Sequence, residues 1–223
     1  MDGVSTTGAS ALATAPAANL VADHIRRAIV EGRLRPGDKI GQDAVAQELG
    51  VSRIPVREAL IQMERDGLLQ IKQNVGAFVA EFDEQMILDH FDVLASVQAL
   101  AAQRIARRGD RSVAGRLRAI SDDVQREDDP RAVNDQALEF HRIVNVASGS
   151  PRLRSVLRGL SRVLPVDIFT YVPGAIEAQR VALAAMTDAI EGGSAAKIRR
   201  AFYDANHQRA ELIIDDLRRR GTF

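Results

Sequence analysis

The spacing of apolar residues near the start of the chain predicts three helices. Four apolar residues fall on one face of a helix predicted over residues 20–32, namely Val21, Ile25, Ala28 and Ile29. Pro36 and Gly37 then mark a turn. Two short helices are predicted over 42–49 and 52–66, with Gly50 between them. This region therefore has the pattern of a small helical unit.

The pattern changes twice further along the chain. Over residues 68–82, β-branched and aromatic residues alternate with polar ones around Asn74 and Gly76, which predicts a two-stranded hairpin. From Asp83 onward, segments rich in Ala, Leu and Arg follow, and strand signals are absent. Helix breaks are expected at Gly109, Pro130, Gly149 to Pro151, Pro165, Pro173 with Gly174, and Gly192 with Gly193. We expect a mainly α fold, in which three helices and a small β-hairpin precede an all-helical bundle of six or seven helices.

These patterns place the expected domain boundaries. Residues 1–18 are mainly Ala, Ser, Thr and Gly with almost no charge, so a disordered tail is expected there. The helix and hairpin unit is assigned to 19–82, and the helical domain to 83–223. The first residues have no basic segment before an apolar block, and no run of about 18 apolar residues occurs anywhere. We therefore expect neither a secretory signal nor membrane insertion, and a cytoplasmic location.

Composition narrows the classes of function. The formal net charge is zero, so any binding of nucleic acid has to come from a local basic cluster. An enzyme, for example an all-α metal-dependent hydrolase, would need a complete ligand set or a nucleophile with its base. The chain has no cysteine, four scattered histidines and no Gly-rich phosphate loop. No enzymatic activity and no cofactor are expected.

Residues 42–61 have the spacing of a helix-turn-helix. The two helices of this motif cross closely, which requires a small residue such as Ala46 at the crossing. Gly50 allows the positive φ that ends the first helix, and Ser52 is expected to cap the second through its side chain. In the second helix the apolar residues at helical spacing are Val56, Ala59, Leu60 and Met63.

Basic residues lie on another face of this second helix. Arg53 and Arg57 are four residues apart near its N-terminus, the part of such a helix that enters the DNA major groove. Arginine there can bond guanine bidentately or fork onto phosphate. The following hairpin is expected to act as a wing that reaches phosphate or the minor groove. The expected DNA-contacting residues are Ser52, Arg53, Pro55, Arg57, Gln62, Arg65, Lys72 and, at the wing tip, Gly76.

The segment from GRLRPGDKI through VAQELGVSRIPVREALIQMERDGLLQIKQNVGAFV closely resembles the winged-helix domain of the GntR family of bacterial regulators. Its PVREAL portion is the most specific part. The helical remainder is similar to the ligand-binding domain of the FadR-type (FCD) subgroup, with FHRIVNVASGSPRL at 140–153 resembling a characteristic helix. The resemblance implies a homodimer that binds a near-palindromic DNA operator. It also implies a repressor that is released by a small organic acid or acyl effector.

The same resemblance implies residue roles that this chain keeps only in part. It places Arg53 and Arg57 at DNA-contacting positions, but it implies a third basic residue where this chain has Asp43. Many relatives hold a metal with one Asp and three His in the helical domain. Here His141 is kept, Ala137 stands four residues before it, and 181–188 contain no histidine.

We therefore expect no bound metal. Asp135, six residues before His141, lies about 120° round the helix from it and should not share a site with it. The histidines left as remnants of a metal site are His141 and His207. To replace the two missing ligands, His90 and Asp92 on the domain's first helix would have to bind the metal. The candidate effector-binding residues are Arg142, Arg162, Arg180, His141 and His207. A second hypothesis stays open, in which the protein is a ligand-independent DNA-binding dimer with a vestigial effector domain.

Overall fold

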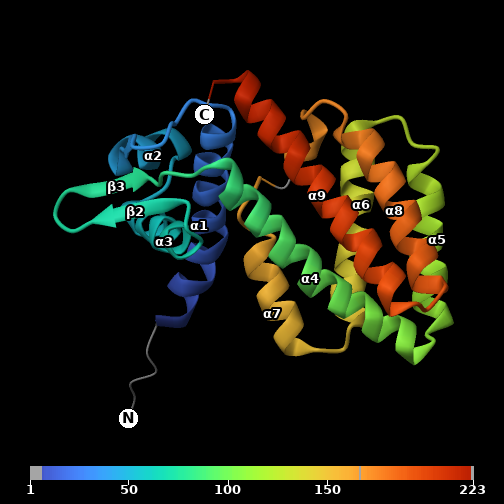
Figure 1. The fold of residues 1–223 in the computed structure, drawn as a ribbon. Helices are drawn as coiled ribbons and strands as arrows, with labels where there is room; N and C mark the ends of the chain where they lie inside the picture. The colour runs from blue at the N-terminus through green and yellow to red at the C-terminus, as the bar shows by residue number, and fades with distance from the viewer. Residues whose placement is uncertain (1–6, 166, 222–223) are drawn as a thin grey trace, which may run out of the picture. The chain divides into compact units, whose positions relative to one another are not determined.

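The computed structural model describes residues 7–165 and 167–221, and of residues 7–16 it describes only the backbone (Figure 1). The described part is mainly helical. The first helices and strands are α1 (Thr7–Val30), β1 (Lys39–Ile40), α2 (Gln42–Leu49), α3 (Arg53–Arg65), β2 (Leu69–Lys72) and β3 (Gly76–Val79). They are followed by α4 (Glu84–Arg108), α5 (Arg111–Val124), α6 (Pro130–Ala147), α7 (Pro151–Leu160), the 3-10 helix η1 (Ile168–Thr170), α8 (Ala175–Glu191) and α9 (Ala195–Arg219).

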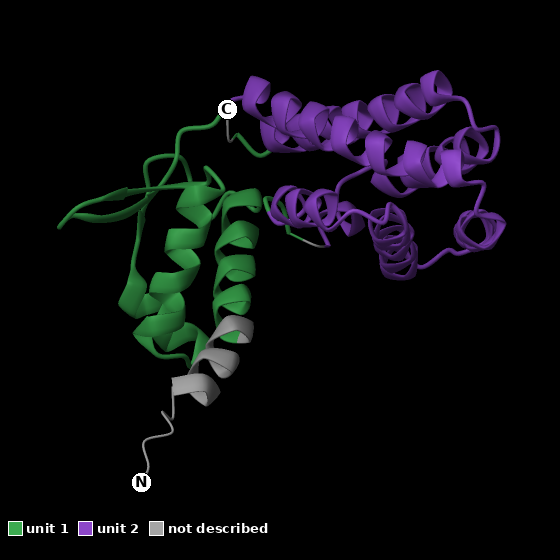
Figure 2. Ribbon diagram, turned by 90° about the horizontal axis from the view of Figure 1, so that it is seen from below, with its two compact units in different colours: residues 1–82, 163–165, 220–222 green, residues 83–162, 166–219, 223 purple. Residues whose placement is uncertain are grey.

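The chain divides into two compact units between Phe82 and Asp83 (Figure 2). The first contains residues 1–82 together with 163–165 and 220–222, and the second contains almost all of the rest. The mainly α fold predicted from the sequence is confirmed, with strands confined to the first unit within the described ranges.

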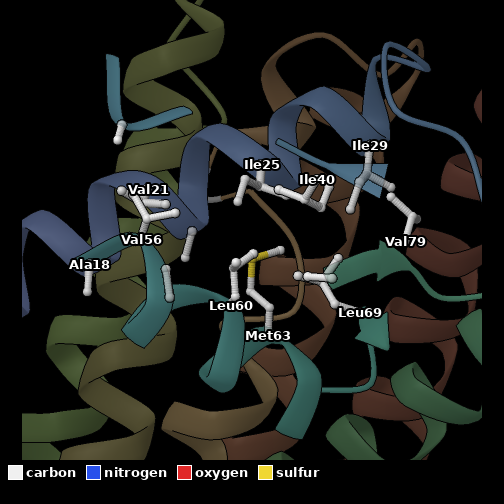
Figure 3. Packing of buried hydrophobic residues seen from close by; sticks show 14 residues of the cluster. Ala18, Val21, Ile25, Ile29, Ile40, Val56, Leu60, Met63, Leu69 and Val79 are labelled. Carbon is white, nitrogen blue, oxygen red and sulfur yellow. The ribbon is translucent and has the colours of Figure 1, made fainter. Parts of the chain in front are cut away.

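The first unit is built round a core shared by α1, α3 and the sheet (Figure 3). Val21, Ile25 and Ile29 of α1 are almost completely buried, as their spacing predicted. All four apolar residues predicted for the inner face of α3 are also buried, namely Val56, Ala59, Leu60 and Met63. This packing fixes which face of α3 points away from the core.

The strands form a three-stranded antiparallel sheet with the order β1-β3-β2. The predicted hairpin is β2 and β3, with Leu69 opposite Val79 and Lys72 opposite Gly76. The third strand, β1, was not predicted. It is two residues long, and its Lys39 and Ile40 pair with Phe78 and Ala77. Two residues are too few for period-two alternation to be visible in the sequence.

Helix α1 begins earlier than predicted. Of the tail expected over 1–18, residues 1–6 lie outside the described residues, whereas from Thr7 the backbone is helical. Ala18 is buried in the core of the first unit. The Ala-rich composition of this segment favours a helix. The prediction of a disordered tail considered only its low charge and its lack of apolar spacing, and overlooked this helix propensity.

The second unit is a helical bundle whose helix starts are capped by side chains. The Asp83 carboxylate accepts a hydrogen bond from Met86 N, and Asp110 accepts from Ser112 N and Val113 N. Asp129 and Ser150 cap α6 and α7, and each precedes a proline at the first helical position. The helix breaks therefore lie at the predicted glycines and prolines.

Helix α9 packs along α4 and α8, and α6 packs against α4, α5 and α8 (Figure 1). The fully buried side chains of these helices include Phe140 of α6, Leu183 of α8 and Phe202 of α9. Within the described residues, no helix is long and apolar enough to cross a membrane.

Candidate functional site

The outer face of α3 presents two arginines. Arg53 and Arg57 are both exposed, one helical turn apart at the N-terminal end of the helix. Arg53 Nε lies 2.6 Å from Asp43 Oδ1 of α2, so this arginine is held by an ion pair across the helix-turn-helix. Arg57 has no such partner among the ion pairs of the described residues. The acidic Asp43, at a position where the resemblance implied a basic contact, thus orients a neighbouring arginine.

Two predicted DNA-contacting residues, Ser52 and Pro55, differ from expectation in what their side chains do. Ser52 is the N-cap residue of α3, but its side chain makes no capping hydrogen bond. Capping side chains accept from the second or third helical N–H, and the third residue here is Pro55, which has none. Pro55 itself is buried in the unit, so its side chain does not belong to the exposed face.

The remaining predicted α3 contacts lie away from Arg53. At about 100° per residue, Gln62 is roughly 180° round the helix from Arg53, and Arg65 roughly 120°. Gln62 is half-buried, while Arg65 is exposed at the last residue of the helix. Their part in DNA contact stays a prediction, and the geometry favours Arg57 over both.

The wing carries a second basic group. Lys72 Nζ lies 4.9 Å from the centre of the Phe78 ring, and Lys39 Nζ of β1 lies 6.0 Å from it. Both lysines are exposed. Lys39 was missed in the sequence because it belongs to the unpredicted strand β1, where its pairing with Phe78 places it on the wing.

Gly76 does not form the wing tip. The turn is made by residues 73–75, with Asn74 in the left-handed region at φ 59°, and Gly76 is the first residue of β3. Gly76 has φ 136°, and a Cβ on it would lie 2.9 Å from Lys39 Cε. The glycine therefore makes room for the Lys39 side chain.

A side-chain hydrogen bond adds to the apolar packing between the wing and α3. Glu64 Oε1 accepts a hydrogen bond of 2.8 Å from Ile71 N, the backbone of β2. Arg57, Glu64 and Lys72 line a groove of about 590 Å³ between the helix and the wing. Basic groups from both elements therefore face one surface, an arrangement suited to a phosphate backbone and the base edges beside it.

A buried polar cluster lies in the second unit. We define it as Gln98 of α4, His141 of α6, Gln179 of α8, and Asn206 and Arg209 of α9. Arg209 Nη2 lies 3.0 Å from His141 Nε2 and donates to Gln179 Oε1 at 3.1 Å. Asn206 Nδ2 donates to Gln98 Oε1 at 3.0 Å, and Gln98 Nε2 lies 3.5 Å from His141 Nδ1. Four helices thus bring together polar groups in the interior of the bundle.

The ionisation of this cluster is set mainly by burial. Burial lowers the pKa of Arg209 from 12.5 to about 10, so its guanidinium is charged at neutral pH. Burial, with the positive charge of Arg209 as a second cause, holds the pKa of His141 well below its usual value, so its imidazole is neutral. A charged donor on a neutral acceptor explains the short contact between them.

His207, predicted as the partner of His141, lies elsewhere. Its side chain is 41% exposed, its Nε2 is 3.6 Å from Glu211 Oε1, and its ring stacks on Tyr203. Arg209 has the position that the sequence prediction gave to His207. The buried residues of α9 include Phe202, Asn206 and Arg209. Extending the apolar spacing of Phe202 along the helix would have identified both polar residues.

The three predicted effector-binding arginines do not join the cluster. Arg142 is 60% exposed and pairs with Glu139 one turn away. Arg162 is exposed beyond the end of α7. Arg180 Nε donates to Val124 O, and its Nη2 donates to Glu127 O, so it holds the end of α5. Among the predicted effector-binding residues, only His141 belongs to the cluster.

The metal site implied by the resemblance lacks its donors. Ala137 is buried four residues before His141, and Asp135 is exposed. The described residues contain no group of three or more His, Asp or Glu that could hold a metal, so His90 and Asp92 of α4 do not complete one. Moreover, the His141 nitrogen that faces Arg209 is occupied by an N–H donor.

The fold and these surfaces define a winged helix-turn-helix protein with an appended helical domain. Residues 17–79 match the family model of bacterial regulatory proteins of the gntR family, and residues 89–207 match the FCD domain. The chain belongs to the GntR family of regulators, with an FCD domain after its winged helix.

Relatives support the same assignment. An uncharacterized HTH-type transcriptional regulator of Mycobacterium tuberculosis is 32% identical over 145 residues, which are 65% of this chain and 59% of that protein. The probable D-xylose utilization operon transcriptional repressor of Paenarthrobacter nicotinovorans is 28% identical over 142 residues, 62% of each chain. The matched segment thus spans about three fifths of these relatives.

Solved structures share the fold. A putative transcriptional regulator GntR from Rhodococcus sp. RHA1 superimposes with a TM-score of 0.59 over 89% of this chain and 97% of that one, at 21% identity. The McbR/YncC protein of E. coli gives a TM-score of 0.61 over 89% and 97%, at 16% identity. At these identities the likeness concerns the fold alone.

Proposed function

We propose that this protein is a sequence-specific transcription regulator that binds a near-palindromic operator as a homodimer. A small organic acid or acyl compound, bound in the helical domain, modulates that binding. Repressor names among the relatives favour a repressor that its effector releases. The observation that carries the DNA-binding part is the exposed, unpaired Arg57 on α3, which shares a groove with Lys72 of the wing.

Arg57 has the geometry of a base-reading residue. The buried face of α3 fixes the opposite face outward, and Arg57 lies there one turn from the N-terminus. Arg53 is engaged in an exposed ion pair with Asp43, which partly neutralises its charge, whereas Arg57 has no such partner within the described ranges. Arg57 is thus the residue whose loss should reduce sequence discrimination most.

The test begins with footprinting the region upstream of the gene to obtain the operator. Arg57→Ala is then expected to weaken operator binding by roughly 5- to 150-fold, the loss of one bidentate base contact, with a smaller effect on scrambled DNA. Arg126→Ala, which removes an exposed arginine from the helical domain, is the charge-matched control. Affinity is measured by fluorescence anisotropy. Unchanged operator affinity in folded Arg57→Ala would reject α3 as the recognition helix.

A further inference from the structure

The buried polar cluster contains a positive charge without a negative partner. Arg209 is 6% exposed, and the ion pairs among the described residues include none to it. Its protein neighbours are the neutral His141, the neutral Gln179 and the face of the Phe169 ring, whose centre is 5.5 Å from the guanidinium carbon. A buried charge without a counter-charge is unfavourable in the folded state and is usually found paired.

The cluster also has more hydrogen-bond donors than acceptors. Arg209 Nε and Gln179 Nε2 are buried without a partner. Because Arg209 donates to His141 Nε2, the single proton of the neutral ring lies on Nδ1, which faces the amide nitrogen of Gln98. Against these donors, the unpartnered acceptor is Asn206 Oδ1. Such an excess of donors suits a ligand that accepts hydrogen bonds and carries negative charge.

A metal ion does not fit this arrangement. His141 Nε2, the nitrogen that faces the cluster, already accepts from Arg209 at 3.0 Å, and the guanidinium would repel a cation at that distance. The position of a carboxylate ligand is taken by Ala137, which is buried. A carboxylate group, in contrast, would meet a planar guanidinium with a free Nε and an amide donor beside it.

We propose that the buried polar cluster binds the carboxylate of a small organic acid directly on Arg209, without a metal ion. The Arg209 guanidinium supplies the charge and Gln179 Nε2 supplies a further donor. His141 positions Arg209 by accepting its Nη2 hydrogen bond, and it keeps part of its surface accessible beside the cluster. This inference rests on the proposed function, because it specifies how the effector of the same domain is held.

The test measures melting temperatures of the full chain in EDTA with sodium succinate, lactate, benzoate and octanoate. The corresponding amides serve as uncharged probes of the same shape. At least one acid is expected to raise the melting temperature by roughly 5–10 °C at 100 times its Kd, while its amide does not. Repeating the series with Zn²⁺ in place of EDTA is expected to give the same shifts in melting temperature.

Three variants assign the response to the cluster. Arg209→Gln is expected to abolish the acid-induced shift, and Gln179→Leu, which leaves the charge in place, is expected to weaken it. If Arg209→Gln does not fold, Gln179→Leu decides the question. Arg180→Gln is the control, because Arg180 is a half-buried arginine of the same domain that binds backbone carbonyls. It is expected to keep the acid response.

Three results would overturn the proposal: no acid shifts the melting temperature, the shift needs Zn²⁺, or the shift survives in folded Arg209→Gln. Operator binding without acid is measured separately on the wild type and Arg57→Ala. A protein that binds acid but no operator would reject the proposed regulator and leave the carboxylate site standing. A protein that binds the operator but responds to none of the acids would reject the carboxylate site and leave the proposed regulator standing.

Discussion

Arg209 should reduce the stability of the protein when no anion is bound. Burial lowers its pKa from 12.5 to about 10, which at 1.36 kcal/mol per pH unit corresponds to roughly 3 kcal/mol against the folded state. Its hydrogen bonds to His141 and Gln179 offset part of this. We therefore expect Arg209→Met to raise the free energy of unfolding by about 1–2 kcal/mol near neutral pH.

Urea unfolding of the two proteins measures this difference. The gain is expected to be constant below about pH 10, because both states of the wild type are then protonated, and to shrink above it, where only the unfolded wild type keeps the proton. A loss of stability in Arg209→Met would mean that the guanidinium is a net structural support. Stability and acid binding are thus expected to change in opposite directions at this residue.

His141 should make the fold sensitive to mild acid. Its pKa is held well below 6.5, mainly by burial, so below about pH 6.5 the unfolded chain gains a proton that the folded chain does not. The stability contribution is fully present above that pH and falls by about 1.4 kcal/mol per pH unit below it. His141→Gln is expected to flatten this slope.

His90 sets the background for that measurement. Burial lowers its pKa as well, so a second and independent loss of stability in acid remains in His141→Gln. The comparison of His141→Gln with the wild type, and not the wild-type slope alone, therefore identifies the His141 contribution. Equal slopes in wild type and His141→Gln would show that the ring protonates in the folded state as easily as in solution.

At the residue scale, the spacing of apolar residues identified the buried face of a helix correctly where that face is apolar. It failed where a polar residue is buried. Val56 and Met63 mark the inner face of α3, and that face placed Arg57 outward. Asn206 and Arg209 lie on the inner face of α9, yet polar residues are ordinarily assigned to the surface. His207 was preferred because its residue type matched a known ligand. The prediction of His207 thus relied on residue type, whereas the angular position round the helix would have identified the buried residues.

At the scale of elements, the helix breaks at glycines and prolines were the most predictable features, whereas the one cap predicted, by the Ser52 side chain, does not form. Asp129 and Ser150, each followed by a proline at the first helical position, determine where α6 and α7 begin, because these residues act locally and need no distant partner. Strand β1 and the contact of Glu64 with the wing were not predictable in this way. Strand β1 depends on pairing with a segment far away in sequence, and the contact between Glu64 and Ile71 depends on how the hairpin folds back onto α3; local patterns report neither.

Gly50 offers a direct test of one local sequence signal, a glycine that ends a helix. It ends α2 with φ 63°, and its N–H bonds to the last turn of the helix. A Cβ at Gly50 would meet no atom within 4 Å, so the expected effect of Gly50→Ala is conformational alone. We expect a loss of about 1 kcal/mol, because an alanine there is forced into the left-handed region.

The matched control is another glycine with equally open surroundings. Gly115 lies inside α5, its φ is not in the left-handed region, and a Cβ there also meets nothing within 4 Å. Gly115→Ala is therefore expected to stabilise the protein by about 0.5–1 kcal/mol. Opposite changes in melting temperature support the assignment, whereas a loss in both variants would point to a packing effect not visible in the structure.

At the scale of the whole molecule, helix α4 has an apolar stripe on its outer face. Met86, Val93 and Leu100 are spaced by seven residues and are 47%, 50% and 39% exposed. Residues at this spacing share one side of a helix, and large apolar side chains in such a row usually meet a partner. Beside the stripe, Leu100 and Tyr203 of α9 line a groove of about 540 Å³. We expect this face to be the dimer interface, with a second copy as the partner.

The proposed binding to a near-palindromic operator would need a two-fold interface of this kind, because each copy would then read one half-site. The double variant Val93→Glu with Leu100→Glu, made in the full chain, is expected to be monomeric by light scattering and to keep its helical content. Two adjacent copies would otherwise bury unpaired carboxylates. Val181→Glu is the control: Val181 is 58% exposed on α8, outside the stripe, and its variant should remain dimeric. The monomer should bind a single half-site as before and lose the extra affinity of the full operator. A double variant that stays dimeric would place the interface on another face.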